Sequence, residues 1–136
     1  MVRRAVLVAG WVSYHQLMDT AQAPVRVAPY QARPGRRVLV VLNLADLRGP
    51  VAGLVELPIR LFWSGASPMF DIGNPGTRQW VYETVLQQAS RPEDLTTLLD
   101  GRTLVALWPG LFVPKGVRQA WEDEHPVLRA ASAAAA

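Results

Sequence analysis

The chain of 136 residues has no cysteine, one lysine and two histidines. Without cysteine it can form neither a disulfide framework nor a thiolate metal site, and it has no thiol nucleophile. It lacks the glycine-rich phosphate loops of nucleotide-binding enzymes and the Gly-x-Ser-x-Gly motif of serine hydrolases. We therefore assign no catalytic residue and no cofactor.

Long apolar runs are also missing, because no stretch reaches the roughly 18–20 residues that a membrane-spanning helix needs. The start, Met1–Val12, superficially resembles a secretion signal, but its apolar run from Ala5 to Val12 is short and polar residues follow it. We expect a soluble, cytoplasmic protein with no membrane contact.

The composition is that of a globular protein, with 50% hydrophobic and 18% charged residues. A chain of this length fits one domain and can bury roughly two-thirds of the surface that its unfolded form exposes. We expect residues 1–136 to form a single domain. Its residues 1–63 would be a β-rich half with a basic connector, and residues 74–136 a helical half.

The formal net charge of +3 is unevenly distributed along the chain. Residues 1–50 carry seven arginines and two acidic residues, for a charge of +5, whereas residues 51–136 carry seven basic and nine acidic residues, for −2. The excess is almost entirely arginine, whose planar guanidinium suits carboxylate and phosphate groups. A genome rich in G and C, which favours arginine codons, is the alternative explanation for the composition.

Two strands are predicted in the first half, the first of them buried. Val38–Leu44 is a dense run of valine and leucine, and residues 53–63 alternate between apolar and polar side chains. We expect these two runs to pair as antiparallel neighbours, with Pro58 placing the second at a sheet edge or in a bulge. Residues 22–37 are expected to be a connector with a turn at Pro34-Gly35. Residues 4–21 fit either a short strand or an amphipathic helix.

In the second half the apolar spacing changes to that of helices. Four helix starts are indicated, at Asn74-Pro75, at Ser90–Glu93 with capping-box spacing, at Asp100 and at Pro114, and Pro126 restarts or bends the chain. The order of elements predicts an α+β fold, in which a small antiparallel sheet from the N-terminal half packs against several short C-terminal helices.

The turn sequence Arg33-Pro34-Gly35-Arg36-Arg37 is the most concrete candidate for function. Its three guanidinium groups, supported by Arg26 and Tyr30, form a candidate binding site for nucleic acid or an acidic protein. The structural alternative is that the arginines only keep a strand edge soluble. We expect a non-enzymatic binding or regulatory protein that uses Arg26, Tyr30, Arg33, Arg36 and Arg37.

A second hypothesis is an accessory module or homodimer that contacts a protein partner. It would use the predicted edge strand at residues 53–63, or the segment from Trp108 to Pro114, where Trp108, Leu111 and Phe112 could form an apolar docking surface. The alternative for these three side chains is packing in the core.

A third hypothesis is a small metal-dependent nuclease or toxin-like hydrolase. His15 and Asp19 are four residues apart and would face the same way on a helix, and His125 could complete a site with them. No metal-binding motif is present, so the structural alternative is that His15 is an ordinary polar residue and that Glu122–Glu124 is a solvated helix end.

Overall fold

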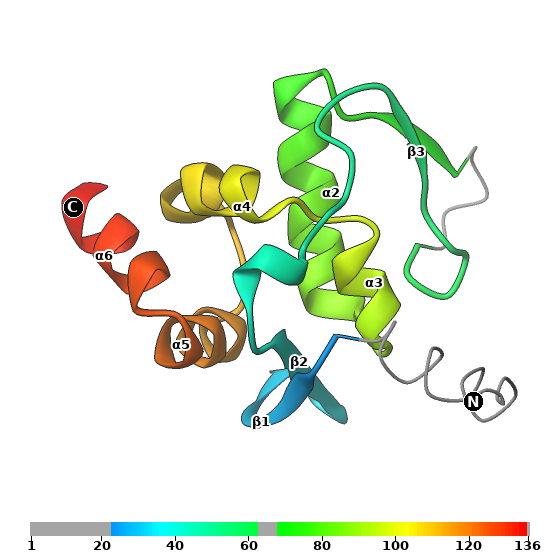
Figure 1. Cartoon of the computed structure of the whole chain (residues 1–136). Helices are drawn as coiled ribbons and strands as arrows, with labels where there is room; N and C mark the ends of the chain where they lie inside the picture. Colours follow the sequence, from blue (N-terminus) through cyan, green and yellow to red (C-terminus); the bar gives the residue numbers. More distant parts are fainter. Residues whose placement is uncertain (1–22, 63–67, 136) are drawn as a thin grey trace, which may run out of the picture.

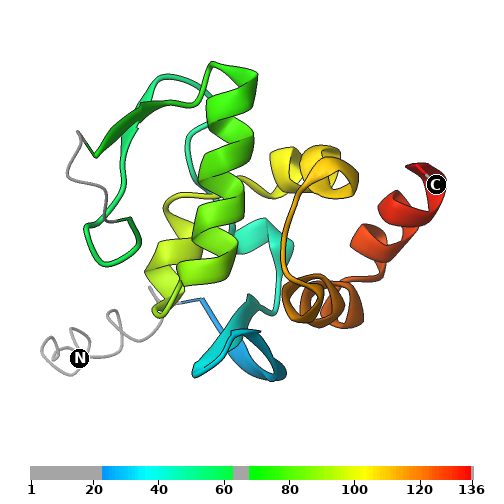
Figure 2. The same ribbon diagram turned by 180° about the vertical axis from the view of Figure 1, so that it is seen from behind.

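The computed structural model describes residues 23–62 and 68–135 (Figure 1). Strands β1 (Val25–Arg33) and β2 (Arg36–Val41) form one antiparallel hairpin, and β3 (Leu54–Glu56) and β4 (Met69–Asp71) form a second. The two hairpins lie at opposite ends of the molecule in both views, with helices between them (Figures 1 and 2). The α+β class is confirmed, although the strands make two small sheets rather than one. The alternatives for residues 4–21 concern a part of the chain outside the described residues.

The first hairpin corrects the prediction that residues 22–37 are a connector. Most of this stretch is β1, which pairs with β2 across a turn at Pro34-Gly35. The turn itself is confirmed, because Gly35 has a φ of +80°, the value that the third position of a type II turn requires. The sequence does not indicate β1, because this strand contains a proline and two arginines and buries only two small side chains, those of Ala28 and Ala32.

The second hairpin shows that the pairing predicted between Val38–Leu44 and residues 53–63 is wrong. β2 pairs with β1, and β3 pairs with β4. β3 ends at Glu56, two residues before Pro58, and the chain then turns, with Leu61 donating its N–H to the carbonyl of Pro58 at 2.9 Å. Pro58 has no N–H to donate to a neighbouring strand. The strand predicted over residues 53–63 therefore ends early, at this turn.

The predicted helix starts are confirmed. Within residues 23–62 and 68–135 the α-helices are α2 (Pro75–Gln88), α3 (Pro92–Thr96), α4 (Gly101–Leu107), α5 (Lys115–Glu124) and α6 (Pro126–Ala135). Asn74 caps α2 through Thr77 N–H, and Asp100 caps α4 through Thr103 N–H. Short 3-10 helices lie at Leu44–Asp46 (η1) and Trp108–Gly110 (η2). Over residues 23–62 and 68–135, no helix combines the length and apolar character needed to cross a membrane.

The capping box of α3 lies one residue later than predicted, with Arg91 instead of Ser90 as the N-cap. Asp94, not Glu93, accepts hydrogen bonds from the backbone N–H groups of Ser90 and Arg91, at 3.0 and 3.1 Å. The Asp94 carboxylate is almost fully buried and also binds the guanidinium of Arg60 through both oxygens. Burial opposes ionisation, but the hydrogen bonds from Arg60 and the two backbone groups outweigh it and lower the pKa of Asp94.

Helix α5 packs directly on the first hairpin. Gly116, in the first turn of α5, lies so close to β1 that a Cβ at this position would overlap the backbone carbonyl oxygen of Gln31. Farther along the helix, Val117 and Trp121 are fully buried in the same hydrophobic core as Val38 and Val40 of β2. The close approach of α5 therefore depends on a residue without a side chain at 116.

The substitution Gly116→Ala tests this contact. Alanine favours a helix by about 1 kcal/mol over glycine, but the overlap with Gln31 should outweigh this and lower the free energy of unfolding by about 1–3 kcal/mol. Chemical denaturation measures the change. Gly110→Ala is the control, because a Cβ there meets no atom within 4 Å. A Gly116→Ala protein as stable as the wild type would contradict the close packing.

Candidate partner-binding site at the β1–β2 turn

The first hairpin places two arginines opposite each other. Arg33 and Arg36 are direct cross-strand partners on either side of the Pro34-Gly35 turn, and Arg37 pairs with Gln31. Three guanidinium groups thus belong to the tip of the hairpin. The structure brings together the three arginines on which the sequence hypothesis chiefly rested.

The other two predicted residues, Arg26 and Tyr30, bind the C-terminal end of α5. Arg26 forms an ion pair with Glu124 at 2.8 Å, and the Tyr30 hydroxyl donates a hydrogen bond to the Asp123 carboxylate at 2.8 Å. Their polar groups therefore already have anionic partners within the chain. They hold the hairpin against α5 rather than extending the unpaired charge of the turn.

The Tyr30–Asp123 hydrogen bond shifts the pKa values of both groups. It stabilises the protonated phenol and so raises the pKa of Tyr30, with smaller contributions from burial and from the charge of Asp123. The same hydrogen bond lowers the pKa of Asp123, helped by hydrogen bonds from Gln119 and Arg129. This carboxylate is therefore ionised at neutral pH, and it also forms an ion pair with Arg129 of α6 at 2.7 Å.

The arginines at the turn lack such anionic partners. Arg33 donates to the neutral side-chain carbonyl of Gln88 at 3.0 Å. Arg36 and Arg37 have no side-chain hydrogen bond or ion pair with any other residue of the described ranges 23–62 and 68–135. Like charges that face each other across a strand pair repel. The turn thus carries positive charge that no carboxylate in the described part of the chain balances.

A shallow depression of about 280 Å3 adjoins the turn. It lies between the hairpin and the loop that connects α2 to α3. It is lined by Val27, Gly35, Arg36, Arg37, Leu39, Ala89 and Ser90. Val27 is 60% exposed, so the two unpaired arginines stand beside accessible apolar surface.

The apolar segment after α4 is divided between core and surface. Trp108 is fully buried, donates its indole N–H to Glu122 at 2.9 Å and lies under the guanidinium of Arg118, 4.9 Å from the ring centre. Leu111 is also buried, whereas Phe112 is 81% exposed. Of the three predicted docking residues, only Phe112 presents its side chain to solvent.

The structure places His125 in the interior. Its Nε2 lies 2.7 Å from the carbonyl oxygen of Val41, and its ring packs at a tilt against Trp121. His15 and Asp19, the other two residues of the metal hypothesis, lie outside the described residues. In the described part of the chain, no three histidine or acidic side chains gather in a way that could hold a metal ion.

For the acidic residues at the end of α5, the alternative of a solvated helix end describes the exposed Asp123, but all three acids also bind other segments of the chain. Glu122 accepts hydrogen bonds from Trp108 and Ser132, while Asp123 and Glu124 bind Tyr30 and Arg26. The two contacts with the hairpin join residues that are more than 90 positions apart in the sequence. Nothing in the local sequence pattern indicates such partners, although the opposite charges of the two segments are a signal that could have suggested them.

Comparison of the chain with protein-family models, with curated proteins and with solved structures gave no match. The interpretation of the turn therefore depends on its own geometry and charge.

The substitution Asp123→Asn tests the hydrogen bond between Tyr30 and Asp123. Loss of the carboxylate should lower the pKa of Tyr30 toward its ordinary value, because the phenol no longer donates to an anion. Alkaline titration of tyrosine absorbance measures this, and Tyr30→Phe identifies the Tyr30 component among the three tyrosines. Glu124→Gln removes the same charge without touching this hydrogen bond and should shift the Tyr30 pKa less. An unchanged titration in Asp123→Asn would contradict the contact.

Proposed function

We propose that the protein is a non-enzymatic binding protein that engages an acidic segment of a partner protein through the β1–β2 turn. One observation carries the proposal. Arg33 and Arg36 face each other across the hairpin, and neither they nor the adjacent Arg37 have a carboxylate partner within the described residues.

The energetics of the turn favour an anionic ligand. Repulsion between directly opposed like charges destabilises a strand pair by a few tenths of a kcal/mol up to about 1 kcal/mol. A carboxylate placed between the guanidinium groups of Arg33 and Arg36 replaces this repulsion with attraction. Guanidinium groups also bind carboxylates through two parallel hydrogen bonds, which adds geometric specificity.

The surroundings of the turn favour a protein ligand over a nucleic acid. A nucleic-acid strand continues beyond any one contact, and farther along the hairpin it would meet Arg26, whose guanidinium is already paired with Glu124. A short acidic peptide segment can end at the turn. The exposed Val27 and the neighbouring Leu39 also offer apolar contacts that suit peptide side chains.

Binding of a labelled oligoglutamate peptide tests the proposal. At about 50 mM salt we expect measurable affinity that falls as salt rises, because the contacts are exposed charges. The double substitution Arg36→Gln/Arg37→Gln should weaken binding roughly tenfold. Fluorescence anisotropy measures both effects.

Arg78→Gln/Lys115→Gln is the matched control, since it removes the same charge from two positions that do not line the depression beside the turn and should change affinity by less than about twofold. Equal losses in the two double variants would show that only net charge matters and would overturn the site. Absence of oligoglutamate binding would overturn the proposal. Tighter binding of single-stranded oligothymidylate, dependent on Arg36 and Arg37, would replace the acidic protein by a nucleic acid.

A further inference from the structure

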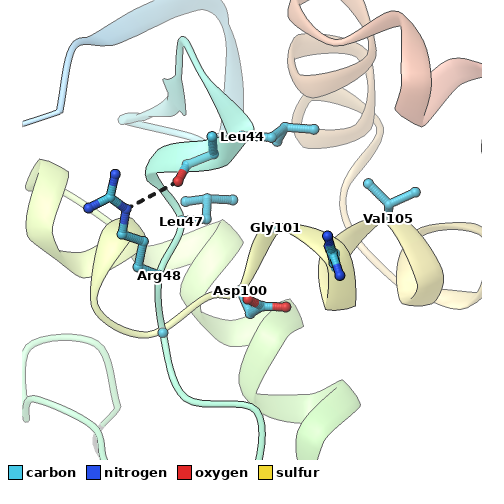
Figure 3. Close-up of a pocket in the computed structure, with 9 residues that line it drawn as sticks. Leu44, Leu47, Arg48, Asp100, Gly101 and Val105 are labelled. Atoms are coloured by element: carbon cyan, nitrogen blue, oxygen red, sulfur yellow. Dashed lines mark hydrogen bonds between the residues drawn. The ribbon is translucent and has the colours of Figure 1, made fainter.

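A pocket of about 600 Å3 lies between η1 and the start of α4, away from the β1–β2 turn (Figure 3). This volume is within the range of roughly 300–1,000 Å3 that small-molecule sites occupy. The lining residues are Leu44, Ala45, Leu47, Arg48, Gly49, Asp100, Gly101, Arg102 and Val105. In Figure 3, Arg48 and Val105 lie at opposite sides of the group of lining residues.

The backbone around this pocket is firmly held. Arg48 and Asp100 form an isolated antiparallel bridge, and Gly49 and Gly101 donate their N–H groups to the carbonyls of Leu99 and Leu47 at 2.7 and 3.1 Å. The two segments approach so closely that a Cβ on either glycine would overlap the opposing backbone. Main-chain contacts thus hold the two backbone segments that carry the lining side chains.

The lining combines an apolar part with unpaired positive charge. Leu44, Leu47 and Val105 supply the apolar part, and Arg48 and Arg102 are exposed. The only side-chain bond of Arg48 within the described residues runs from Nε to the carbonyl of Ala45 at 3.3 Å, the dashed line of Figure 3.

The one carboxylate of the pocket is already engaged in capping α4. Asp100 Oδ2 accepts hydrogen bonds from both the backbone N–H and the hydroxyl of Thr103, at 3.0 and 2.9 Å. Neither Arg48 nor Arg102 forms an ion pair with a described residue. Two guanidinium groups therefore remain available beside an apolar lining.

We propose that this pocket binds a small organic carboxylate with an apolar body. The carboxylate would accept hydrogen bonds from the guanidinium groups of Arg48 and Arg102, and the apolar body would cover Leu44, Leu47 and Val105. A purely inorganic anion would leave the apolar lining unused. An organic cation would meet two like charges. An organic carboxylate is the ligand class that suits both the arginines and the apolar part of the lining.

Titration with three probes tests the proposal. Naphthylacetate should bind the full-length protein, whereas naphthylmethylammonium, of similar shape and opposite charge, and inorganic phosphate should bind at least roughly tenfold more weakly. Chemical shifts of the backbone amides of residues 44–49 and 100–105 should change on titration. Equal binding of phosphate would reduce the pocket to an inorganic anion site and overturn the proposal, as would equal binding of the cation.

Two variants separate the contributions of charge and shape. Arg48→Gln/Arg102→Gln should weaken naphthylacetate binding roughly tenfold, and Val105→Phe should weaken it by filling the pocket without a change of charge. Arg78→Gln/Lys115→Gln is the matched control, because neither residue lines this pocket, and it should leave the affinity within about twofold. Absence of binding to the wild type, or the same affinity in all variants, would overturn the proposal.

Discussion

The packing of α5 on the β1–β2 hairpin joins residues 25–41 to residues 115–124. The geometry of the candidate binding site depends on this contact. Gly116 allows the helix to approach the backbone of Gln31, and the C-terminal end of the same helix supplies acceptors for Arg26 and Tyr30. Behind this contact, His125 binds the carbonyl of Val41 at the end of β2. An isolated two-stranded hairpin is marginally stable in water, so β1 and β2 need this helix.

The same packing divides the charge of the hairpin into two parts. Where β1 lies beside the end of α5, its basic and phenolic groups are bound by Asp123 and Glu124. The arginines of the turn form no ion pair with these acids, and Arg36 and Arg37 keep their charge without a partner among the described residues. The modest net charge of +3 therefore conceals a local concentration of positive charge. The binding role that we propose for the turn depends on where the charge is left unbalanced, not on the total.

Helix starts were predictable from the sequence because each depends on a few adjacent residues, as with Asn74-Pro75 and the Asp100 cap. Strand partners were not, because pairing joins distant segments and β1 buries only small side chains in a stretch rich in proline and arginine. The three arginines of the turn could be chosen locally, since one turn joins them. The pairing of Arg26 could not be predicted, because its partner Glu124 lies 98 residues away and no local pattern specifies that contact.

Comparing the stabilities of Arg26→Gln and Arg36→Gln tests the division of charge most directly. At low salt, Arg26→Gln should lower the free energy of unfolding, because it breaks an ion pair, and Arg36→Gln should raise it, because it relieves repulsion from Arg33. Each change should be about 0.5 kcal/mol and should diminish at about 1 M salt, where exposed charges are screened. A loss of stability in Arg36→Gln equal to that in Arg26→Gln would show that the turn carries no unbalanced charge.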